Sequence, residues 1–440
     1  MQEREVQMAT LENHIAEYNK AIQRKFYEQN YFSYKWRKSI ETVENALVFP
    51  QTKQDSSQKL HRNPNAVNIH NGGVYREDGE IVESSLHVAS AANKNIPDLI
   101  IDKIRYPVEE LTGTWVYGGF LKTHIGHLVT ESLGRLWAFD DLTEKVQGLI
   151  FIHMNGFPKV VHEEEFSLEV LDRAAEKSIK ANGYVEEIIS FFSRPCPIKV
   201  SGRPFKVERL IVPSQLMGLQ SASDLIGGHE TYRLSVSKHI SKNIPLDNDL
   251  EPLKLYVSRS KLSVASSSFF MESAFEAALS LEGYTILYPE KIGFTEQMAL
   301  YARASHVILA SGSACHVLAL ACSRHQHVAL LNRHEGTWAG FGRQLRLMGA
   351  ASVLELEHIS GVFSPEDSSS TSTLKLHPAR LVHSLDLALI WGLLRKNGFV
   401  SSFGMKLDPE EFSNGLELTF QALRLAYPEH GFVYQRRERP

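Results

Sequence analysis

Two histidines, a glutamate and an arginine fall within one short amphipathic segment, HIGHLVTESLGRLW (residues 124–137). If the segment is a helix, offsets of three, seven and eleven place these side chains on one stripe: His124, His127, Glu131 and Arg135. An imidazole accepts a proton near neutral pH, and a carboxylate one turn away can orient it. The stripe therefore indicates a general base, while a solvated helix face remains the alternative.

The same histidines also raise the alternative of a zinc site. His124 and His127 are three residues apart, and Glu131 follows one turn later. However, the spacing is not HExxH, and no distant cluster of cysteine or histidine completes a ligand set. A zinc-dependent hydrolase that uses these three residues is therefore kept as a competing hypothesis.

A cationic group follows the apolar run LKLYV, at the end of a predicted strand. It consists of Ser258, Arg259, Ser260 and Lys261. Arginine offers a bidentate fork and lysine a compact charge, the two devices that proteins use against phosphoryl oxygens. The group predicts a phosphate site, with an ordinary surface turn as the alternative.

Small residues fill the turn after another apolar run, HVILA. Ser311, Gly312 and Ser313 lead into a predicted helix that contains Ala314 and His316. A helix that starts this way lets phosphate approach its backbone N–H groups. Because parallel strands end at one sheet edge, we expect this turn and the cationic group to meet around one diphosphate. His316 is expected to bind phosphate or to cap the helix.

Three further polar residues lie between these two segments. Glu290 follows a predicted strand, and Glu296 and Gln297 open the next helix. Glu296 has the ordinary role of an acid at a helix N-terminus. Glu290 and Gln297 are candidates to hydrogen-bond a ribose or a base.

Strands and helices alternate along most of the chain. The clearest predicted strands are GLIFIHMNG, VERLIVPS, LKLYVSR, YTILYP, HVILAS, HVALLN and SVLELE. Predicted helices separate them, among them SLEVLDRAAEKSI, MESAFEAALSLEG, TEQMALYARAS and SACHVLALACS. This alternation predicts an α/β fold with a parallel, doubly wound sheet. Gly118 and Gly119 are expected to form a tight turn before the histidine helix.

The two ends of the chain have different patterns. Residues 1–47 lack proline and glycine and carry apolar residues at helical spacing, which predicts a helical extension that either docks on its own domain or dimerises. Near the C-terminus, the stretch SPEDSSSTST predicts a loop, and ARLVHSLDLALIWGLLRKNG and SNGLELTFQALRLAYP predict helices. We expect boundaries that give segments 1–60, 61–245, 246–375 and 376–440.

The composition is that of a soluble globular protein. The net charge of −4 gives no reason to expect a nucleic acid partner. The three cysteines show no CxxC spacing, which favours a reducing, cytoplasmic compartment. No apolar segment is long enough to span a bilayer, so any membrane association is expected to be peripheral.

The motifs and their order over residues 115–330 resemble glycosyltransferase family 61, especially its bacterial, capsule-type members. The resemblance rests on GGF, HIGHLVTESLGRLW, RLIVPS, LYVSRSKL, GYTILYPEKIGFTEQMALYARASHVI and GSACH. It implies a GT-B fold with two facing Rossmann-like domains, of which 61–245 binds the acceptor and 246–375 the nucleotide sugar. It also implies inversion of the anomeric configuration without a required metal or other cofactor.

The resemblance assigns the family's motif residues to His127, Glu131, Arg259, Glu272, Gln297, Gly312, Ser313 and His316. This chain has Met271 where the family often has asparagine, and Ser311 where it commonly has a charged residue or histidine. Both departures bear on the identity of the donor sugar.

The mechanism expected from these assignments is transfer from a nucleoside-diphosphate sugar to a hydroxyl of a glycan or related acceptor, in surface polysaccharide biosynthesis. His127 is the first choice for the base, Glu131 its orienter or the alternative base, and His124 a weaker candidate. Arg259, Lys261 and the backbone amides of residues 312–314 would stabilise the leaving diphosphate. A non-catalytic polysaccharide-binding or assembly protein is the alternative from another functional class.

Overall fold

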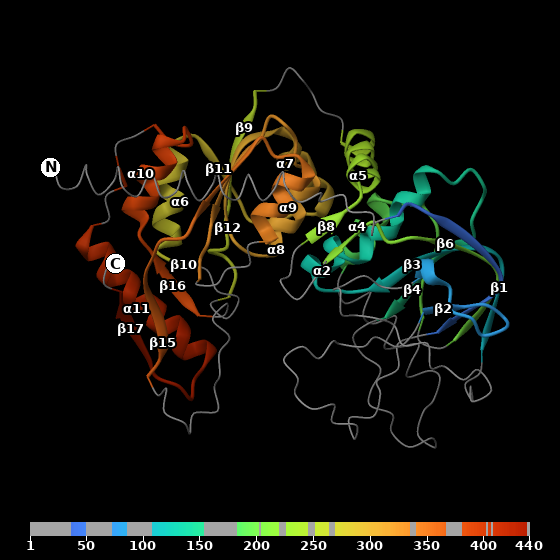
Figure 1. Cartoon of the computed structure of the whole chain (residues 1–440). Coiled ribbons are helices and arrows are strands. Elements are labelled where there is room, and N and C mark those ends of the chain that lie inside the picture. The colour runs from blue at the N-terminus through green and yellow to red at the C-terminus, as the bar shows by residue number, and fades with distance from the viewer. Residues whose placement is uncertain are drawn as a thin grey trace.

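The structure is a computed structural model with a mixed α/β fold (Figure 1). It describes residues 37–49, 73–85, 108–153, 183–201, 204–219, 226–244, 251–263, 269–334, 340–366, 381–401, 404–405 and 408–437. The predicted helices within residues 1–36 and 167–179, and most of the predicted Ser/Thr loop, lie outside these ranges. The proposed dimerising role of the N-terminal extension lies there as well.

A six-stranded sheet forms the N-terminal half. Its spatial order is β2-β1-β6-β3-β4-β5. The strands are β1 (Ile40–Phe49), β2 (Gly73–Tyr75), β3 (Glu109–Leu121), β4 (Gly148–His153), β5 (Ile198–Ser201) and β6 (Phe205–Pro213). Strands β6, β3, β4 and β5 run parallel, and β1 pairs antiparallel with both β2 and β6.

The helical prediction for the N-terminal extension is wrong at its end, because residues 40–49 form strand β1. Val43 and Val48 are buried from this strand, so its apolar residues serve a sheet rather than a helix face. The predicted tight turn is also wrong. Gly118 and Gly119 lie inside β3, where Gly119 has a φ of 92° next to an irregularity in the pairing with β4.

A second sheet has five strands, all parallel. They are β9 (Leu253–Val257), β11 (Tyr284–Leu287), β12 (Ala304–Ala310), β13 (His327–Leu331) and β14 (Ser352–Leu356). Numbered in chain order, they lie in the spatial order 2-1-3-4-5. This is the order of one common doubly wound fold, whose switch point lies between strands 1 and 3. Here these strands are β9 and β12, which the cationic group and the small-residue turn follow.

Helices cover both faces of this sheet, as its alternating side chains require. Ile308 and Ala310 of β12 pack in one apolar cluster with α6 (Glu272–Leu281) and α10 (Leu387–Lys396). Val307 and Leu309 pack in another cluster with α7, α8 and α9. These helices span Phe294–Arg303, Ser313–Leu320 and Gly340–Met348. The predictions of a helix at α6, α7 and α8 are confirmed.

The second cluster continues into the N-terminal half. It includes residues of α2 (Ile125–Thr130), α4 (Gly183–Phe191) and α5 (Glu230–Asn243), and Figure 1 shows these helices beside α7, α8 and α9. The rings of Phe191 and Phe294 meet edge to face, with centroids 5.2 Å apart. Glu187 of α4 accepts a hydrogen bond of 3.0 Å from the backbone N–H of Thr295. One apolar core thus joins the two halves of the chain.

A third sheet follows, in the order β10-β16-β15-β17. Its strands are β10 (Phe269–Phe270), β15 (Ile359–Pro365), β16 (Val382–Leu385) and β17 (Phe432–Arg436). The helix predicted to begin near residue 379 is therefore wrong at its start, because residues 382–385 are a strand and the helix α10 begins at Leu387. The second predicted C-terminal helix is confirmed as α11 (Pro409–Ala426).

Two smaller findings concern the chain as a whole. Among the described residues, no helix has both the length and the apolar character needed to cross a bilayer. All three cysteines, Cys196, Cys315 and Cys322, are free thiols.

Candidate active site

The histidine segment is not one continuous α-helix. The helix α2 ends at Thr130, and the chain continues as a 3₁₀ helix, η3 (Ser132–Asp140). The change in pitch turns Arg135 away from the stripe. Its buried guanidinium donates hydrogen bonds to the carbonyls of Ser84 and Pro213 and lies 5.2 Å from the ring centroid of Tyr117. Arg135 thus ties η3 to the sheet, and the prediction that it shares the polar stripe is wrong.

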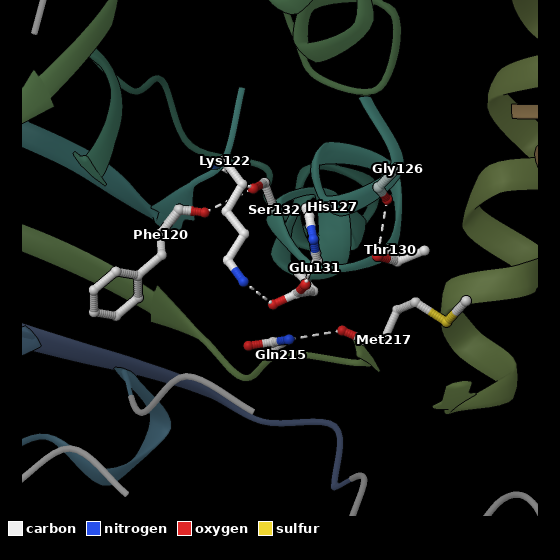
Figure 2. A network of polar contacts seen from close by, with 9 residues as sticks. All are labelled: Phe120, Lys122, Gly126, His127, Thr130, Glu131, Ser132, Gln215 and Met217. Atoms are coloured by element: carbon white, nitrogen blue, oxygen red, sulfur yellow. Dashed lines mark hydrogen bonds and ion pairs between the residues drawn. The ribbon is translucent and has the colours of Figure 1, made fainter. Parts of the chain in front are cut away.

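His127 and Glu131 form a hydrogen-bonded pair (Figure 2). Nδ1 of His127 lies 2.5 Å from Oε1 of Glu131. The Glu131 side chain has no exposed surface, whereas that of His127 is 48% exposed. Because a carboxylate oxygen only accepts, Nδ1 is assigned the proton and Nε2 keeps its lone pair. The pair therefore has the geometry of an oriented imidazole base.

Lys122 completes this group from the end of β3. Its ammonium lies 2.7 Å from Oε2 of Glu131, and its side chain is 14% exposed. The hydroxyl of Ser132 accepts a hydrogen bond from the Lys122 backbone N–H and donates one to the carbonyl of Phe120 (Figure 2). Lys122 was not among the residues expected from the sequence. No strand was predicted over residues 109–121, where a tight turn was expected at Gly118 and Gly119, so the position of Lys122 at a strand end carried no signal.

His124 lies beside this pair at the start of α2. Its ring centroid is 5.5 Å from that of His127. Burial, and then the neighbouring His127, lower the pKa of His124, so its ring is neutral at pH 7. Among the described residues, no group of three or more histidine, cysteine, aspartate or glutamate side chains is placed to hold a metal ion. The geometry gives no support to the zinc alternative, because Lys122 and His127 engage both oxygens of Glu131.

His316 connects the histidine helix to the other half of the chain. A Cβ atom added at Gly126 of α2 would lie 2.9 Å from Cδ2 of His316, so the ring packs directly on this glycine. Its Nδ1 lies 2.5 Å from Oε1 of Gln344 in α9. Burial lowers the pKa of His316 to about 4, which makes it a neutral ring at pH 7. The structure places it within the contact of α2, α8 and α9, and its predicted role in phosphate binding stays a prediction.

Arg259 lies against the small-residue turn, as the sequence predicted. A Cβ atom at Gly312 would be 2.7 Å from Nη1 of Arg259. Only a residue without a side chain permits this approach. Burial lowers the pKa of Arg259, and the charge of Glu272 opposes that effect. The guanidinium remains a cation at neutral pH next to the first turn of α8.

A second guanidinium, that of Arg333, lies at the same edge of the sheet and was missed by the sequence analysis. Its Nε donates a hydrogen bond of 2.7 Å to the carbonyl of Ser311. Burial, followed by the positive charge of Arg259, lowers the pKa of Arg333 to about 10. Arg333 follows strand β13 in the same way that Arg259 follows β9, so the same rule could have found it.

The serines of the cationic group have a structural role. The hydroxyl of Ser260 donates a hydrogen bond of 2.6 Å to Oε1 of Glu276, and the hydroxyl of Ser258 donates one to the same atom. Glu272 accepts a hydrogen bond of 2.8 Å from the backbone N–H of Arg259. Burial raises the pKa of Glu272 to about 7. The two acids of α6 thus hold the loop that presents Arg259.

The remaining predicted residues are dispersed around this group. Lys261 is exposed, with its ammonium 5.8 Å from the ring centroid of Tyr288. Glu290 is exposed in the 3₁₀ helix η5 (Pro289–Lys291), close enough to Arg259 to favour its charged form. The amide of Gln297 donates to the carbonyls of Pro289 and Ile292, so Gln297 shapes this loop from a buried position. Its assignment to a ribose or base stays a prediction.

The arrangement brings two chemical functions onto adjoining helices. The start of α2 carries an oriented imidazole, and α2 packs against α8 through Gly126 and His316. Gly312 is the N-cap residue of α8, and Arg259 lies against it. Such a pair can remove a proton on one side and stabilise an anionic leaving group on the other.

We compared the chain with curated proteins and with models of protein families. No curated protein matches the chain at a significant level. The model of the glycosyltransferase 61 family matches residues 125–328, which include α2, the cationic group and the turn at Gly312. This match confirms the resemblance seen in the sequence. Over residues 125–328, the chain therefore matches glycosyltransferase family 61.

Proposed function

We propose that the protein is an inverting glycosyltransferase of the GT-B type. It moves a sugar from a nucleoside-diphosphate sugar to a hydroxyl of a glycan or related acceptor, in surface polysaccharide biosynthesis. The observation that carries this proposal is the contact of α2 with α8, which joins the oriented imidazole of His127 to the helix that begins beside Arg259. The family assignment gives independent support to the class of reaction.

The donor diphosphate is assigned to the carboxyl edge of the five-stranded sheet. The backbone N–H groups of residues 312–314 point along the start of α8, and a helix N-terminus favours an anion. Arg259, Arg333 and Lys261 add positive charge at the same edge. Removing one such donor from a developing anion typically costs about 10²–10³ in rate.

Transfer follows from a single in-line displacement. The acceptor oxygen attacks the anomeric carbon while Nε2 of His127 takes the hydroxyl proton. The bond from the anomeric carbon to the diphosphate oxygen breaks, and both bonding electrons stay with the leaving diphosphate. One displacement inverts the anomeric configuration. Glu131 stabilises the imidazolium that forms and keeps its orientation.

We propose that no metal is required, because guanidinium and ammonium groups supply the positive charge that a divalent cation would supply at a diphosphate. A cytoplasmic location, free or at the inner face of the membrane, is proposed on the basis of the three free thiols.

A panel of nucleoside-diphosphate sugars tests this proposal. Thermal-shift screening should find one donor that stabilises the protein, by about 2.7 kcal/mol at 100 Kd. Arg259→Ala should abolish that shift, whereas Arg395→Ala, which removes a guanidinium at the end of α10 remote from this edge, should keep it. The product should have an inverted anomeric configuration by NMR, and excess chelator should leave the rate unchanged.

Two results would overturn the proposal. Retention of the anomeric configuration would exclude a single displacement. Binding of a glycan with no donor binding and no turnover would favour the alternative of a non-catalytic polysaccharide-binding protein.

A further inference from the structure

We propose that Lys122 is a positioning residue that keeps the His127–Glu131 pair from holding a second proton. This inference rests on the proposed function, because it assigns a role to a residue that supports the base. Lys122 lies outside the segment that the family model matches. Its ammonium contacts one oxygen of the carboxylate and the imidazole contacts the other, so Lys122 acts on His127 through Glu131.

Glu131, the carboxylate that Lys122 contacts, is buried. Its side chain has no exposed surface, so water cannot stabilise the carboxylate. A buried carboxylate without a partner takes up a proton instead of remaining charged. The ammonium of Lys122, 2.7 Å from Oε2 of Glu131, places a positive charge next to this carboxylate.

The number of protons that the pair holds decides whether it can act as a base. With Glu131 ionised and one proton on Nδ1 of His127, Nε2 can accept a proton. When the pair takes up a second proton from solvent, the carboxyl group donates to Nδ1 and Nε2 carries the other proton. This doubly protonated form cannot remove a proton from a hydroxyl. Lys122 favours the singly protonated form because it stabilises the anion.

Lys122 is a cation in direct contact with this carboxylate. The ring of His124 is neutral, and so is the ring of His316 on α8. Tyr184 of α4 donates to the carbonyl of Thr123, and Tyr232 of α5 donates to that of Val129. Among the described residues, the titratable groups around α2 include His316, Tyr184 and Tyr232 of neighbouring elements. Those of its own segment include Lys122, His124, Glu131 and Arg135.

The backbone of Lys122 is also fixed in place. Ser132 at the start of η3 bonds both the N–H of Lys122 and the carbonyl of Phe120. These contacts clamp the end of β3 to the turn that carries Glu131 (Figure 2). The ammonium therefore reaches Glu131 from a rigid strand end, which is what a positioning role requires.

Kinetics of Lys122→Met against pH test the inference. The variant should lower kcat by about 10-fold or more at pH 7, and change the donor KM by less than about two-fold. The acidic limb of the kcat profile should move to higher pH by about one unit, because the pair binds its proton more tightly without the neighbouring cation. Lys122→Arg should recover most of the activity.

The chain offers a matched control. Lys199 of β5 forms a 2.6 Å ion pair with Glu109 at the start of β3, at the opposite end of that strand. Lys199→Met should leave kcat and the pH profile unchanged. An unchanged pH profile in Lys122→Met, or a loss confined to the donor KM, would refute the positioning role.

A measurement without turnover separates this inference from the proposed function. The nitrogen shifts of the His127 ring in NMR should show an unprotonated Nε2 in the wild type and a protonated Nε2 in Lys122→Met, near neutral pH. If Lys122→Met folds poorly, the double variant Lys122→Met/Glu131→Gln removes the buried charge and should restore the melting temperature, with activity no higher than that of Glu131→Gln. An unprotonated Nε2 in Lys122→Met would overturn the inference even if no donor is ever found.

Discussion

At the scale of single residues, the site depends on close approaches that ordinary side chains would prevent. Gly312 has a φ of 158° and a ψ of −171°, and the guanidinium of Arg259 occupies the place of its missing side chain. Gly126 leaves similar room for the ring of His316. Two glycines thus set how near the arginine comes to α8, and how near α8 comes to α2.

Gly312→Ala should weaken donor binding by about 10-fold and lower stability by about 1–3 kcal/mol. The added methyl group displaces Arg259, and the backbone conformation is one that suits glycine alone. Isothermal titration with the donor and urea unfolding measure the two effects. Gly392→Ala is the control, because it lies in α10 with open space around it and should stabilise the protein by about 0.5–1 kcal/mol. Unchanged donor affinity in Gly312→Ala would contradict the claim that the close approach of Arg259 to Gly312 supports donor binding.

His316 should make the protein less stable in mild acid. Its pKa is about 4 in the folded protein and about 6.5 in the unfolded chain. Below about pH 6.5 the unfolded chain therefore binds a proton that the folded protein rejects. Above about pH 6.5 the unfolded chain binds no extra proton at this ring, so the protein keeps its full stability. By pH 4 the extra proton lowers the free energy of unfolding by about 3 kcal/mol.

Urea unfolding of His316→Asn between pH 7.5 and pH 4.5 checks this sign. The variant should show a flatter dependence on pH than the wild type. His325→Asn, which changes an exposed ring in the loop after α8, should keep the wild-type slope. An equal dependence of the free energy of unfolding on pH in the wild type and in His316→Asn would show that the folded protein does not hold His316 as a neutral buried ring.

At the scale of elements, helices and strands were predicted best where the spacing of apolar residues is regular along the whole element. The five parallel strands are continuous apolar runs, and α6, α7 and α8 lie between them with clear boundaries. The prediction was wrong where residues with a helical spacing form another kind of element. The segment 124–137 has a helical pattern, yet its second half is a 3₁₀ helix that sends Arg135 to the carbonyls of the sheet. Strand β1 carries apolar residues that also fit a helix.

The site residues follow the same division. Arg259 beside Gly312 could be predicted because parallel strands end at one edge, and this rule also covers Arg333. The buried position of Gln297 and the bonds of Ser258 to Glu276 could not, because they depend on loops whose course the pattern does not define. Lys122 meets Glu131 only because η3 folds back onto β3.

Glu187→Ala should destabilise the protein by about 1 kcal/mol. Glu187 of α4 accepts hydrogen bonds from the N–H and the hydroxyl of Thr295, so it caps α7 across the contact of the two halves. The midpoint of urea unfolding measures the loss. Glu186→Ala removes an exposed neighbour on the same helix and should leave the midpoint unchanged. Equal effects of the two variants would argue against the cap.

At the scale of the whole molecule, one apolar core connects the six-stranded sheet with the five-stranded sheet. The histidine helix α2 follows strand β3 of the first sheet, and Arg259 follows strand β9 of the second. The proposed base and the proposed anion site come from different halves of the chain, and the α2–α8 contact sets their separation. A donor bound at Gly312 would therefore lie next to an acceptor deprotonated by His127. We propose that transfer depends on this arrangement and on His127 as its base.

The most direct test of that claim is the turnover number of His127→Ala with the donor identified by thermal shift. We predict that kcat falls by about 10²–10⁴-fold while the donor KM stays within about two-fold, because the imidazole takes a proton and does not hold the diphosphate. His325→Ala, which changes an exposed histidine in the loop after α8, should turn over like the wild type. Wild-type turnover by His127→Ala would contradict the account.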